Sequence, residues 1–481
     1  MEKGNIIELT ISDMTDDGKG IGHVDGMAIF VDRTIPGDRV SAKISRMKKR
    51  YAIASLVEIL EPSADREEAV CPYFEKCGGC SLQSMKYEAQ VQMKLQHVRD
   101  KLTRLGGLKD PVIRDIIVNP QGPDIQYRNK AVFAVFESKD GPLVGFRRRG
   151  SSQVVDIDDC MLQKEPVLAV ARAVRRLIAS RLITVNDERR RNPPKDGKAR
   201  LREFSVRVCE GTGEMMVVLT LTSKKLANSD QIILALDDAV NEASDEYSLE
   251  SVVYEIKRGD IHDPANDYIV AAGARTIRDQ VEIAGRNMNF EISAPAFYQV
   301  NTRQMVRLYE KVRDYAALTG EEVLFDLYCG IGTIGLSMAV QAAMVVGIEE
   351  VPGAILDANR NAVINGIVNA RYYLGKAEEM LPCILDPSDK NYADYLFKED
   401  LSDRTKVVVL DPPRGGCDEK LLDTVAAAGA DRVVYVSCDA GTLARDVRHL
   451  QELGYEFVEA TPVEMFAWTM HIEVVAKIQR R

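Results

Sequence analysis

The sequence lacks any long uninterrupted apolar run, and its first ten residues include charged side chains. A transmembrane helix needs about 20 consecutive apolar residues, and a secretory signal places an apolar stretch behind a basic start. Neither pattern occurs. We therefore expect a protein that has no membrane partner and works in the cytoplasm.

Positive charge is also in short supply. The 481 residues include 63 Lys and Arg against 73 Asp and Glu, which gives a formal net charge of −10. This balance excludes a surface that is basic all over, although local basic segments can still contact phosphates. Two such segments occur, KISRMKKR at 43–50 and RRRNPPKDGKARLR at 189–202. Each is a candidate phosphate-contacting segment, and a solvated loop is the simpler interpretation of each.

The chain is too long for one hydrophobic core, so two to four domains are expected. Residues 1–62 contain short strands broken by Gly, Pro and Asp, which predicts a small OB-like β-barrel. Residues 63–290 mix strand and helix patterns, with an amphipathic helix over 87–105, and predict an α+β domain. Residues 291–481 alternate strands and helices, which predicts a Rossmann-like domain. The fold class is therefore multidomain α/β.

Three of the nine cysteines lie within ten residues, in CPYFEKCGGC. Cys71, Cys77 and Cys80 have the spacing C-x5-C-x2-C, and Cys160 is the obvious candidate for a fourth ligand. In a cytosolic chain such a group favours metal binding or catalysis over disulfides. Zinc and an iron–sulfur cluster both accept four thiolates, and the uneven spacing favours the cluster only slightly.

A glycine loop follows the first strand of the Rossmann-like region. Gly330, Gly332 and Gly335 spell G-x-G-x-x-G, and Glu349 ends the next strand about twenty residues on. An acidic residue there suits hydrogen bonds to ribose hydroxyls, so a nucleoside site is predicted. NAD and S-adenosylmethionine both fit. The Asp-Pro-Pro turn at 411–413 favours the methyl donor.

Near the end of the chain, the apolar run Val433–Val436 stops at Ser437 and Cys438. Cys438 follows Ser437 in a polar turn, and a helix pattern begins at about Thr442. A strand that enters a helix in this way exposes the loop at the carboxyl edge of a sheet, where ligands bind in open α/β folds. A helix N-terminus lowers a thiol pKa, so Cys438 is a candidate nucleophile.

Six segments resemble the motifs of the RNA 5-methyluridine methyltransferases, in the same order and across nearly the whole chain. They are FYQVN (297–301), DLYCGIGTIGL (326–336), GIE (347–349), DPPRGG (411–416), YVSCD (435–439) and HIE (471–473). The barrel resembles the TRAM domain of this family. The cysteine segment with Cys160 resembles its four-iron cluster site.

The resemblance implies S-adenosylmethionine and a 4Fe-4S cluster as cofactors, and RNA as the partner of a monomer. Members with both barrel and cluster mostly modify 23S ribosomal RNA. The implied residues fall into three sets: Gln299, Tyr328, Gly330, Gly332, Glu349 and Asp411 for the methyl donor; Cys71, Cys77, Cys80 and Cys160 for the cluster; Cys438 as nucleophile and Glu473 as general base.

The implied chemistry needs both catalytic residues. A thiolate that adds to carbon 6 of uracil makes carbon 5 nucleophilic, and a base must later remove the carbon-5 proton. Glu473 suits that role, although Glu473 could also be an ordinary strand residue that faces solvent. His471 is a weaker candidate for the base. The target base must first be unstacked.

Two rival functions remain open at this point. One is transfer RNA as the substrate, and the other is an RNA-binding protein with an inactive catalytic domain. The chain departs from the family pattern at Gly415, Asp439-Ala440, Ala467-Trp468 and Val474. None of these positions is a proposed catalytic residue, so the departures bear on substrate fit rather than on reaction type.

Overall fold

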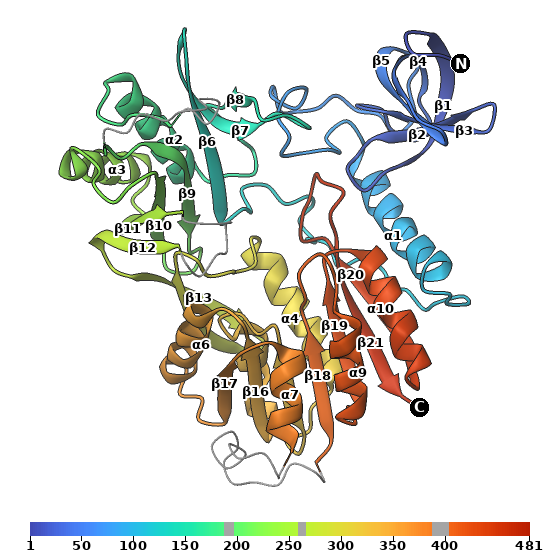
Figure 1. The fold of residues 1–481 in the computed structure, drawn as a ribbon, viewed down its shortest axis with the longest axis vertical. Coiled ribbons are helices and arrows are strands. Elements are labelled where there is room, and N and C mark those ends of the chain that lie inside the picture. Colours follow the sequence, from blue (N-terminus) through green and yellow to red (C-terminus); the bar gives the residue numbers. More distant parts are fainter. Residues whose placement is uncertain (187–196, 258–265, 387–403) are drawn as a thin grey trace.

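The structure is a computed structural model that describes residues 1–186, 197–257, 266–386 and 404–481. A barrel, a central sheet and a carboxyl-terminal sheet form three parts, with helix α1 (Tyr87–Arg104) beside the first and the third (Figure 1). Within the described ranges, no helix is long and apolar enough to cross a membrane. Most of the basic segment 189–202, and all but the first residue of the polar stretch 386–403, lie outside them.

The amino-terminal part is a closed barrel with the strand order β1-β2-β3-β5-β4. Its strands are β1 (Ile6–Met14), β2 (Gly20–Val24), β3 (Met27–Val31), β4 (Arg39–Met47) and β5 (Tyr51–Glu61). Inward positions alternate with outward ones, and Leu9, Ile11 and Val40 fill the core. This confirms the predicted barrel. Because β1 runs antiparallel to β4, with Ile6 opposite Lys43, the turn after β4 lies at the other end of the barrel from the turn after β1.

Helix α1 packs against the carboxyl-terminal sheet and its helix α10 (Ala440–Glu452). Val98 and Leu102 are fully buried in the same core as strands of that sheet. Burying an aliphatic side chain of this size contributes about 1.5–3 kcal/mol. The helix also buries Lys94, whose Nζ lies 2.6 Å from Oε1 of Glu464, each side chain being 1% exposed.

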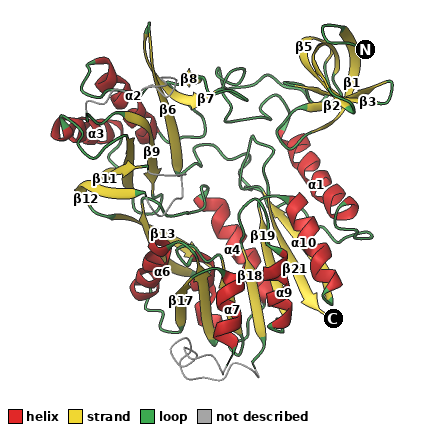
Figure 2. Ribbon diagram, in the orientation of Figure 1, coloured by secondary structure: helices red, strands yellow, loops and turns green. Residues whose placement is uncertain are grey.

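The central part is a seven-stranded sheet with the order β12-β11-β10-β9-β6-β7-β8. The strands are β6 (Lys130–Ser138), β7 (Gly141–Arg147), β8 (Val154–Asp156), β9 (Leu201–Val208), β10 (Glu214–Leu221), β11 (Ser248–Ile256) and β12 (Asp267–Gly273). Helices α2 (Glu165–Ala179) and α3 (Ser229–Ala243) share one apolar core with it (Figure 2). All neighbours pair antiparallel except β10 and β11, which pair parallel.

A hairpin links this sheet to the last part. Its strands β13 (Thr276–Ile283) and β14 (Arg286–Ser293) bury Ile277, Phe290 and Ile292 in one core with α4 (Thr302–Ala316) and the carboxyl-terminal sheet. The hairpin therefore packs against both parts, since Met216, Val218 and Val253 of the central sheet belong to the same core. The domain limits at residues 62 and 290 stay predictions.

The carboxyl-terminal sheet has seven strands in the order β17-β16-β15-β18-β19-β21-β20. They are β15 (Val323–Leu327), β16 (Met344–Glu349), β17 (Ala370–Leu374), β18 (Lys406–Leu410), β19 (Arg432–Ser437), β20 (Tyr455–Val463) and β21 (Glu473–Arg480). Covering elements are α4, α5 (Thr333–Met338), η1 (Ala339–Gln341), α6 (Pro352–Ile364), α7 (Ala377–Leu385), α9 (Glu419–Ala427) and α10. The five neighbouring strands β17, β16, β15, β18 and β19 run parallel to one another.

This topology explains the sequence pattern and places the binding edge. Strands such as β18, KVVVL, read as unbroken apolar runs because separate cores cover the two faces of the sheet. Strand β15 pairs with both β16 and β18, so the strand order reverses there. Ligands of open α/β sheets bind at the carboxyl ends of strands beside such a reversal.

Candidate active site

Sheet register brings five of the predicted residues to one edge. Leu327 pairs with Ile348 on one side and Leu410 on the other, so the next residues, Tyr328, Glu349 and Asp411, lie side by side. Strand β21 runs antiparallel to β19, with Ser437 opposite Val474. One position further on, Cys438 lies opposite Glu473. The predicted nucleophile, the predicted base and the carboxylates predicted to bind the nucleoside therefore share one edge.

The glycine loop is tied to two acidic residues. Glu349 accepts hydrogen bonds from the N–H groups of Gly330 (3.1 Å) and Val351 (3.0 Å). Asp326 accepts one from Gly335 at 2.8 Å. Burial raises the pKa of Glu349, and it raises that of Asp326 to about 7. Side chains at Gly330 would meet open space, so the loop leaves room for a ligand beside the Glu349 carboxylate.

Tyr328 carries backbone strain at the same edge. Its φ of 65° is in the left-handed region, which costs a non-glycine residue about 1–3 kcal/mol. Backbone hydrogen bonds from Tyr328 and Cys329 to the Ile348 carbonyl oxygen, each 3.1 Å, hold this conformation. Gln299 approaches from the segment before α4 and is 4% exposed; its carbonyl oxygen accepts from the Asn129 side chain at 2.8 Å.

Two carboxyl groups lie beside the nucleophile. Glu473 is 4% exposed, and burial followed by the charge of Asp411 raises its pKa well above the ordinary value. Burial and the charge of Asp326 raise the pKa of Asp411 to about 7. The charge of the Arg414 guanidinium acts to lower the pKa of Glu473. Burial therefore disfavours the charged carboxylate of Glu473, and a positive charge in the pocket favours it.

Cys438 differs from the sequence expectation in its acidity. Burial, and then the Glu473 carboxyl, raise its pKa to about 11, although α10 begins two residues later. Asp439, the N-cap of α10, makes a smaller contribution in the same direction. Its carboxylate accepts from Gly441 N–H at 2.8 Å and thereby places a negative charge where the helix N-terminus would otherwise favour the thiolate. Arg414 is the neighbouring group that lowers the thiol pKa.

His471 is held in a neutral state by its surroundings. Its Nδ1 accepts a hydrogen bond from Nη2 of Arg414 at 2.8 Å, and burial followed by the Arg414 charge lowers its pKa to about 4. Strand β21 begins only at Glu473, so His471 lies in the preceding loop and does not share a strand face with Glu473 as the sequence suggested. Glu473 is the better placed base.

Residues from outside the carboxyl-terminal sheet hold the loop 464–472 that leads to Glu473. Backbone N–H groups of Ser81 and Leu82 bond the Trp468 carbonyl oxygen at 2.9 and 3.1 Å. The Tyr127 hydroxyl bonds the Ala467 carbonyl oxygen at 3.1 Å. Burial lowers the pKa of Lys94 and raises that of Glu464, so each keeps its charge only through the other; removing one partner of such a pair costs about 3–5 kcal/mol.

The four predicted cluster cysteines are neighbours next to this loop. Burial raises the pKa of Cys80 to about 12, and the nearby thiols of Cys160, Cys77 and Cys71 raise it as well. Cys80 and Cys160 pack against Trp468. In the described part of the chain, no three His, Cys, Asp or Glu side chains form a group that could hold a metal ion. These contacts leave the iron–sulfur cluster a proposal.

Sequence reasoning missed several residues of the site. Arg414 contacts His471 and acts to lower the pKa of both Cys438 and Glu473. Its position directly after the Asp-Pro-Pro turn was the available signal. Asp326 lies near the end of an apolar strand, and a lone acid in that position was a second signal. The pocket beside Cys438 also takes residues from α1 and from the barrel. The family resemblance implied that helix 87–105 packs on the methyltransferase domain, whereas the sequence holds no signal for the barrel residue Asp16.

Sheet order, glycine loop and the carboxylate at the end of β16 together define a methyltransferase-class α/β domain. A family described as tRNA (Uracil-5-)-methyltransferase matches residues 235–481, and the TRAM domain matches residues 1–57. The chain belongs to the RNA uracil-5-methyltransferase family, in the form with an amino-terminal TRAM domain.

Curated relatives and one solved structure cover the whole chain. An uncharacterized RNA methyltransferase of Halalkalibacterium halodurans is 38% identical over 480 residues, covering 100% of this chain and 98% of the relative. One of Bacillus cereus is 37% identical over 477 residues, covering 99% and 97%. The Pyrococcus abyssi tRNA (uracil-54, C5)-methyltransferase in complex with S-adenosyl-L-homocysteine has a TM-score of 0.70 at 24% identity and covers 98% of this chain and 100% of that one. At that identity the likeness concerns the fold.

Proposed function

We propose that the protein transfers a methyl group from S-adenosylmethionine to carbon 5 of a uridine in 23S ribosomal RNA. One observation carries the proposal: the register of β19 and β21 sets Cys438 opposite Glu473 at the edge that also holds Glu349 and Asp411. A nucleophile and a base across one pocket, beside a nucleoside site, suit covalent activation of a pyrimidine.

The residues at the edge fit the methyl donor. The open space at Gly330 and the carboxylate of Glu349 suit a ribose, as they do in other nucleoside-binding α/β folds. Gln299, Tyr328, Gly332 and Asp411 complete the proposed contacts. Bound there, S-adenosylmethionine supplies an electrophilic methyl group and a positive sulfonium charge.

The protein's own groups perform the remaining steps. Cys438, as the thiolate, adds to carbon 6 of the uracil, and the displaced electron pair makes carbon 5 nucleophilic, so that it takes the methyl group. Glu473 then accepts the carbon-5 proton. The electrons of that C–H bond restore the carbon 5–carbon 6 double bond, and the carbon–sulfur bond breaks to release the thiolate.

The substrate can be assigned by measuring 5-methyluridine in separated RNAs. Deleting the gene should remove 5-methyluridine from one position of 23S ribosomal RNA and leave transfer RNA unchanged, as read by nucleoside mass spectrometry. Transfer RNA is the second candidate, because the matching family and the Pyrococcus abyssi enzyme of similar fold are both named for it. If 5-methyluridine is lost from transfer RNA alone, transfer RNA is the substrate. No loss from either would favour an inactive RNA-binding protein.

We further propose that Cys71, Cys77, Cys80 and Cys160 hold a 4Fe-4S cluster. The donor set fits, because the four thiols are partly buried neighbours, and Cys80 and Cys160 pack on the apolar cluster that includes Trp468. A cubane takes one thiolate per iron, so its ligands stand further apart than those of a single ion. The residues would hold the cluster and so order the loop that leads to Glu473.

Metal analysis tests this assignment. Protein purified without oxygen should be brown and carry about four irons per chain, as four-thiolate cubane sites do. Replacing Cys160 by serine should lower the iron content, whereas replacing Cys383, which lies on α7, should not. Stoichiometric zinc with no iron would rule the cluster out.

A further inference from the structure

We propose that the pocket beside Cys438 binds a phosphate of the RNA next to the target uridine, and that Lys101 and His97 reach it by giving up ion pairs with the barrel. The proposal rests on the proposed function only in taking RNA as the substrate. It assigns a role to the wall of this pocket formed by α1 and the barrel, which the methyl-transfer chemistry does not use.

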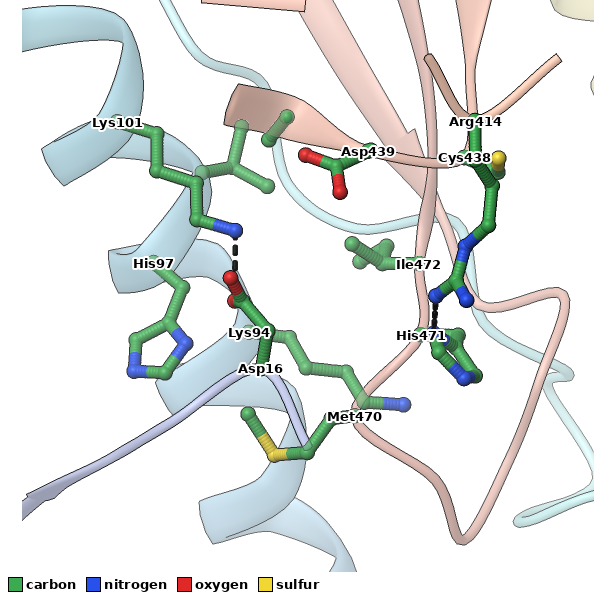
Figure 3. Close-up of a pocket in the computed structure, with 12 residues that line it drawn as sticks. Asp16, Lys94, His97, Lys101, Arg414, Cys438, Asp439, Met470, His471 and Ile472 are labelled. Atoms are coloured by element: carbon green, nitrogen blue, oxygen red, sulfur yellow. Dashed lines mark hydrogen bonds and ion pairs between the residues drawn. The ribbon is translucent and has the colours of Figure 1, made fainter. Parts of the chain in front are cut away.

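Three separate parts of the chain form this pocket (Figure 3). Cys438, Asp439 and Ala440 come from the β19–α10 connection, and Met470, His471 and Ile472 come from the loop before β21. Helix α1 contributes Lys94, His97, Val98 and Lys101, the Asp-Pro-Pro turn contributes Arg414, and the barrel contributes Asp16. A strand of RNA that delivers a base to Cys438 is therefore expected to run past the α1 and barrel residues that line this pocket.

Two donor side chains of α1 are paired with carboxylates of the barrel in the free protein. Lys101 Nζ lies 2.6 Å from Oδ1 of Asp16, and Nε2 of His97 lies 2.9 Å from Oδ1 of Asp13. The Lys101 and His97 side chains are only 23% and 16% exposed, whereas those of Asp16 and Asp13 are 67% and 51% exposed. The Lys101 and His97 side chains are thus part of the pocket wall, whereas the carboxylates of Asp16 and Asp13 face solvent.

The exchange needs only side-chain rotation. The backbone of the β1–β2 turn is anchored at Gly18, where an added Cβ would lie 2.7 Å from Cβ of Ser81 and 3.6 Å from Cγ of Met470. An ion pair with an exposed carboxylate contributes little, since water and salt screen it. A phosphate offers more acceptor oxygens at a higher charge, so it can displace Asp16 from Lys101.

The other charged groups of the pocket are already engaged. Asp439 caps α10, Lys94 is paired with Glu464, and Arg414 bonds the neutral His471. Among the α1 residues of the pocket wall, Lys101 and His97 are therefore the donors that a phosphate can recruit, because their partners are exposed carboxylates. This surface differs from the basic segment 43–50, because that segment ends at the opposite end of the barrel.

Opposite substitutions of one ion pair test the proposal. The measurement is fluorescence anisotropy of a labelled 20-nucleotide oligouridine at several salt concentrations, which needs neither methyl transfer nor a known target site. Lys101→Ala should weaken binding roughly tenfold, because a charge-assisted hydrogen bond is lost. It should also reduce the slope of log K against log[salt] by about 0.7. Asp16→Asn should strengthen binding, because Lys101 no longer has to break a pair.

Two controls separate phosphate binding from domain docking. Arg104→Ala removes an exposed cation from the end of α1 that pairs only with Asp100, and oligouridine binding should be unchanged. The double variant Asp16→Lys with Lys101→Asp restores an ion pair but removes the phosphate contact, so it should bind as weakly as Lys101→Ala. Recovery of binding in the double variant, or weaker binding by Asp16→Asn, would overturn the proposal. If Lys101→Ala lowers the melting temperature, Lys101→Gln gives the same reading with the aliphatic stem kept.

Discussion

Replacing Cys438 by alanine is expected to abolish methyl transfer, by roughly 10⁴-fold or more. The substitution removes the group that activates carbon 5, and uracil carbon 5 is too weak a nucleophile to react without it. No protein–RNA adduct should form either. The measurement is incorporation of radiolabelled methyl groups from S-adenosylmethionine into unmodified ribosomal RNA. Cys383→Ala is the matched control, because Cys383 lies on α7, outside the pocket.

A Cys438→Ala protein that still methylates would show that the covalent mechanism is wrong. Folding can be checked through RNA binding, which does not depend on the thiol. Burial and the Glu473 carboxyl keep the Cys438 thiol protonated in the free protein, whereas Arg414 favours the thiolate. The reactive thiolate is therefore expected to be populated mainly when the pocket is filled.

The sequence predicted those parts of the site that depend on local pattern. Tyr328, Glu349, Asp411 and Cys438 each follow an apolar strand of a βα unit, and parallel strands of one sheet end at a common edge. Pattern alone placed Glu349 and Cys438 at that edge, whereas Tyr328 and Asp411 were given as contacts of the methyl donor by the family resemblance. Glu473 was predicted from the family resemblance, because the first residue of a strand has no local signature in the sequence.

The walls of the pocket could not be predicted, because they depend on contacts between distant segments. Lys94 and Glu464 are 370 positions apart, and an amphipathic helix gives no indication of which sheet it covers. The acidity of Cys438 was misjudged for a related reason. The expected help from a helix N-terminus depends on its cap, and Asp439 places a carboxylate there.

The departure at Ala467-Trp468 has a structural account. Trp468 adopts a φ of 70°, and its indole N–H donates to the Asp124 carbonyl oxygen at 3.1 Å. Its own carbonyl oxygen accepts from the segment that follows Cys80. In this chain the loop before Glu473 is therefore shaped by packing on the cysteine segment, where a rigid Pro-containing turn is usual in the family.

Replacing Glu473 by glutamine is expected to stop the reaction after methyl transfer. Attack by Cys438 and transfer of the methyl group need no base, whereas release of the cysteine needs the carbon-5 proton to leave. Turnover should fall roughly 10²- to 10⁴-fold. A covalent complex with methylated RNA should accumulate and survive denaturing electrophoresis, where the wild-type protein shows none. Folding should be kept, because glutamine matches the glutamic acid side chain in size and carries no charge at a position where burial raises the carboxyl pKa.

His471→Gln is the matched control for the Glu473 substitution. His471 lies two residues before Glu473, and its Nδ1 accepts from Arg414, so its loss should slow the reaction through Arg414 without trapping an adduct. Normal turnover by Glu473→Gln would make Glu473 a structural residue. An adduct trapped by His471→Gln instead would assign proton removal to the histidine. Only an adduct in Glu473→Gln, with the methyl group already on the RNA, fits a base that acts after methyl transfer.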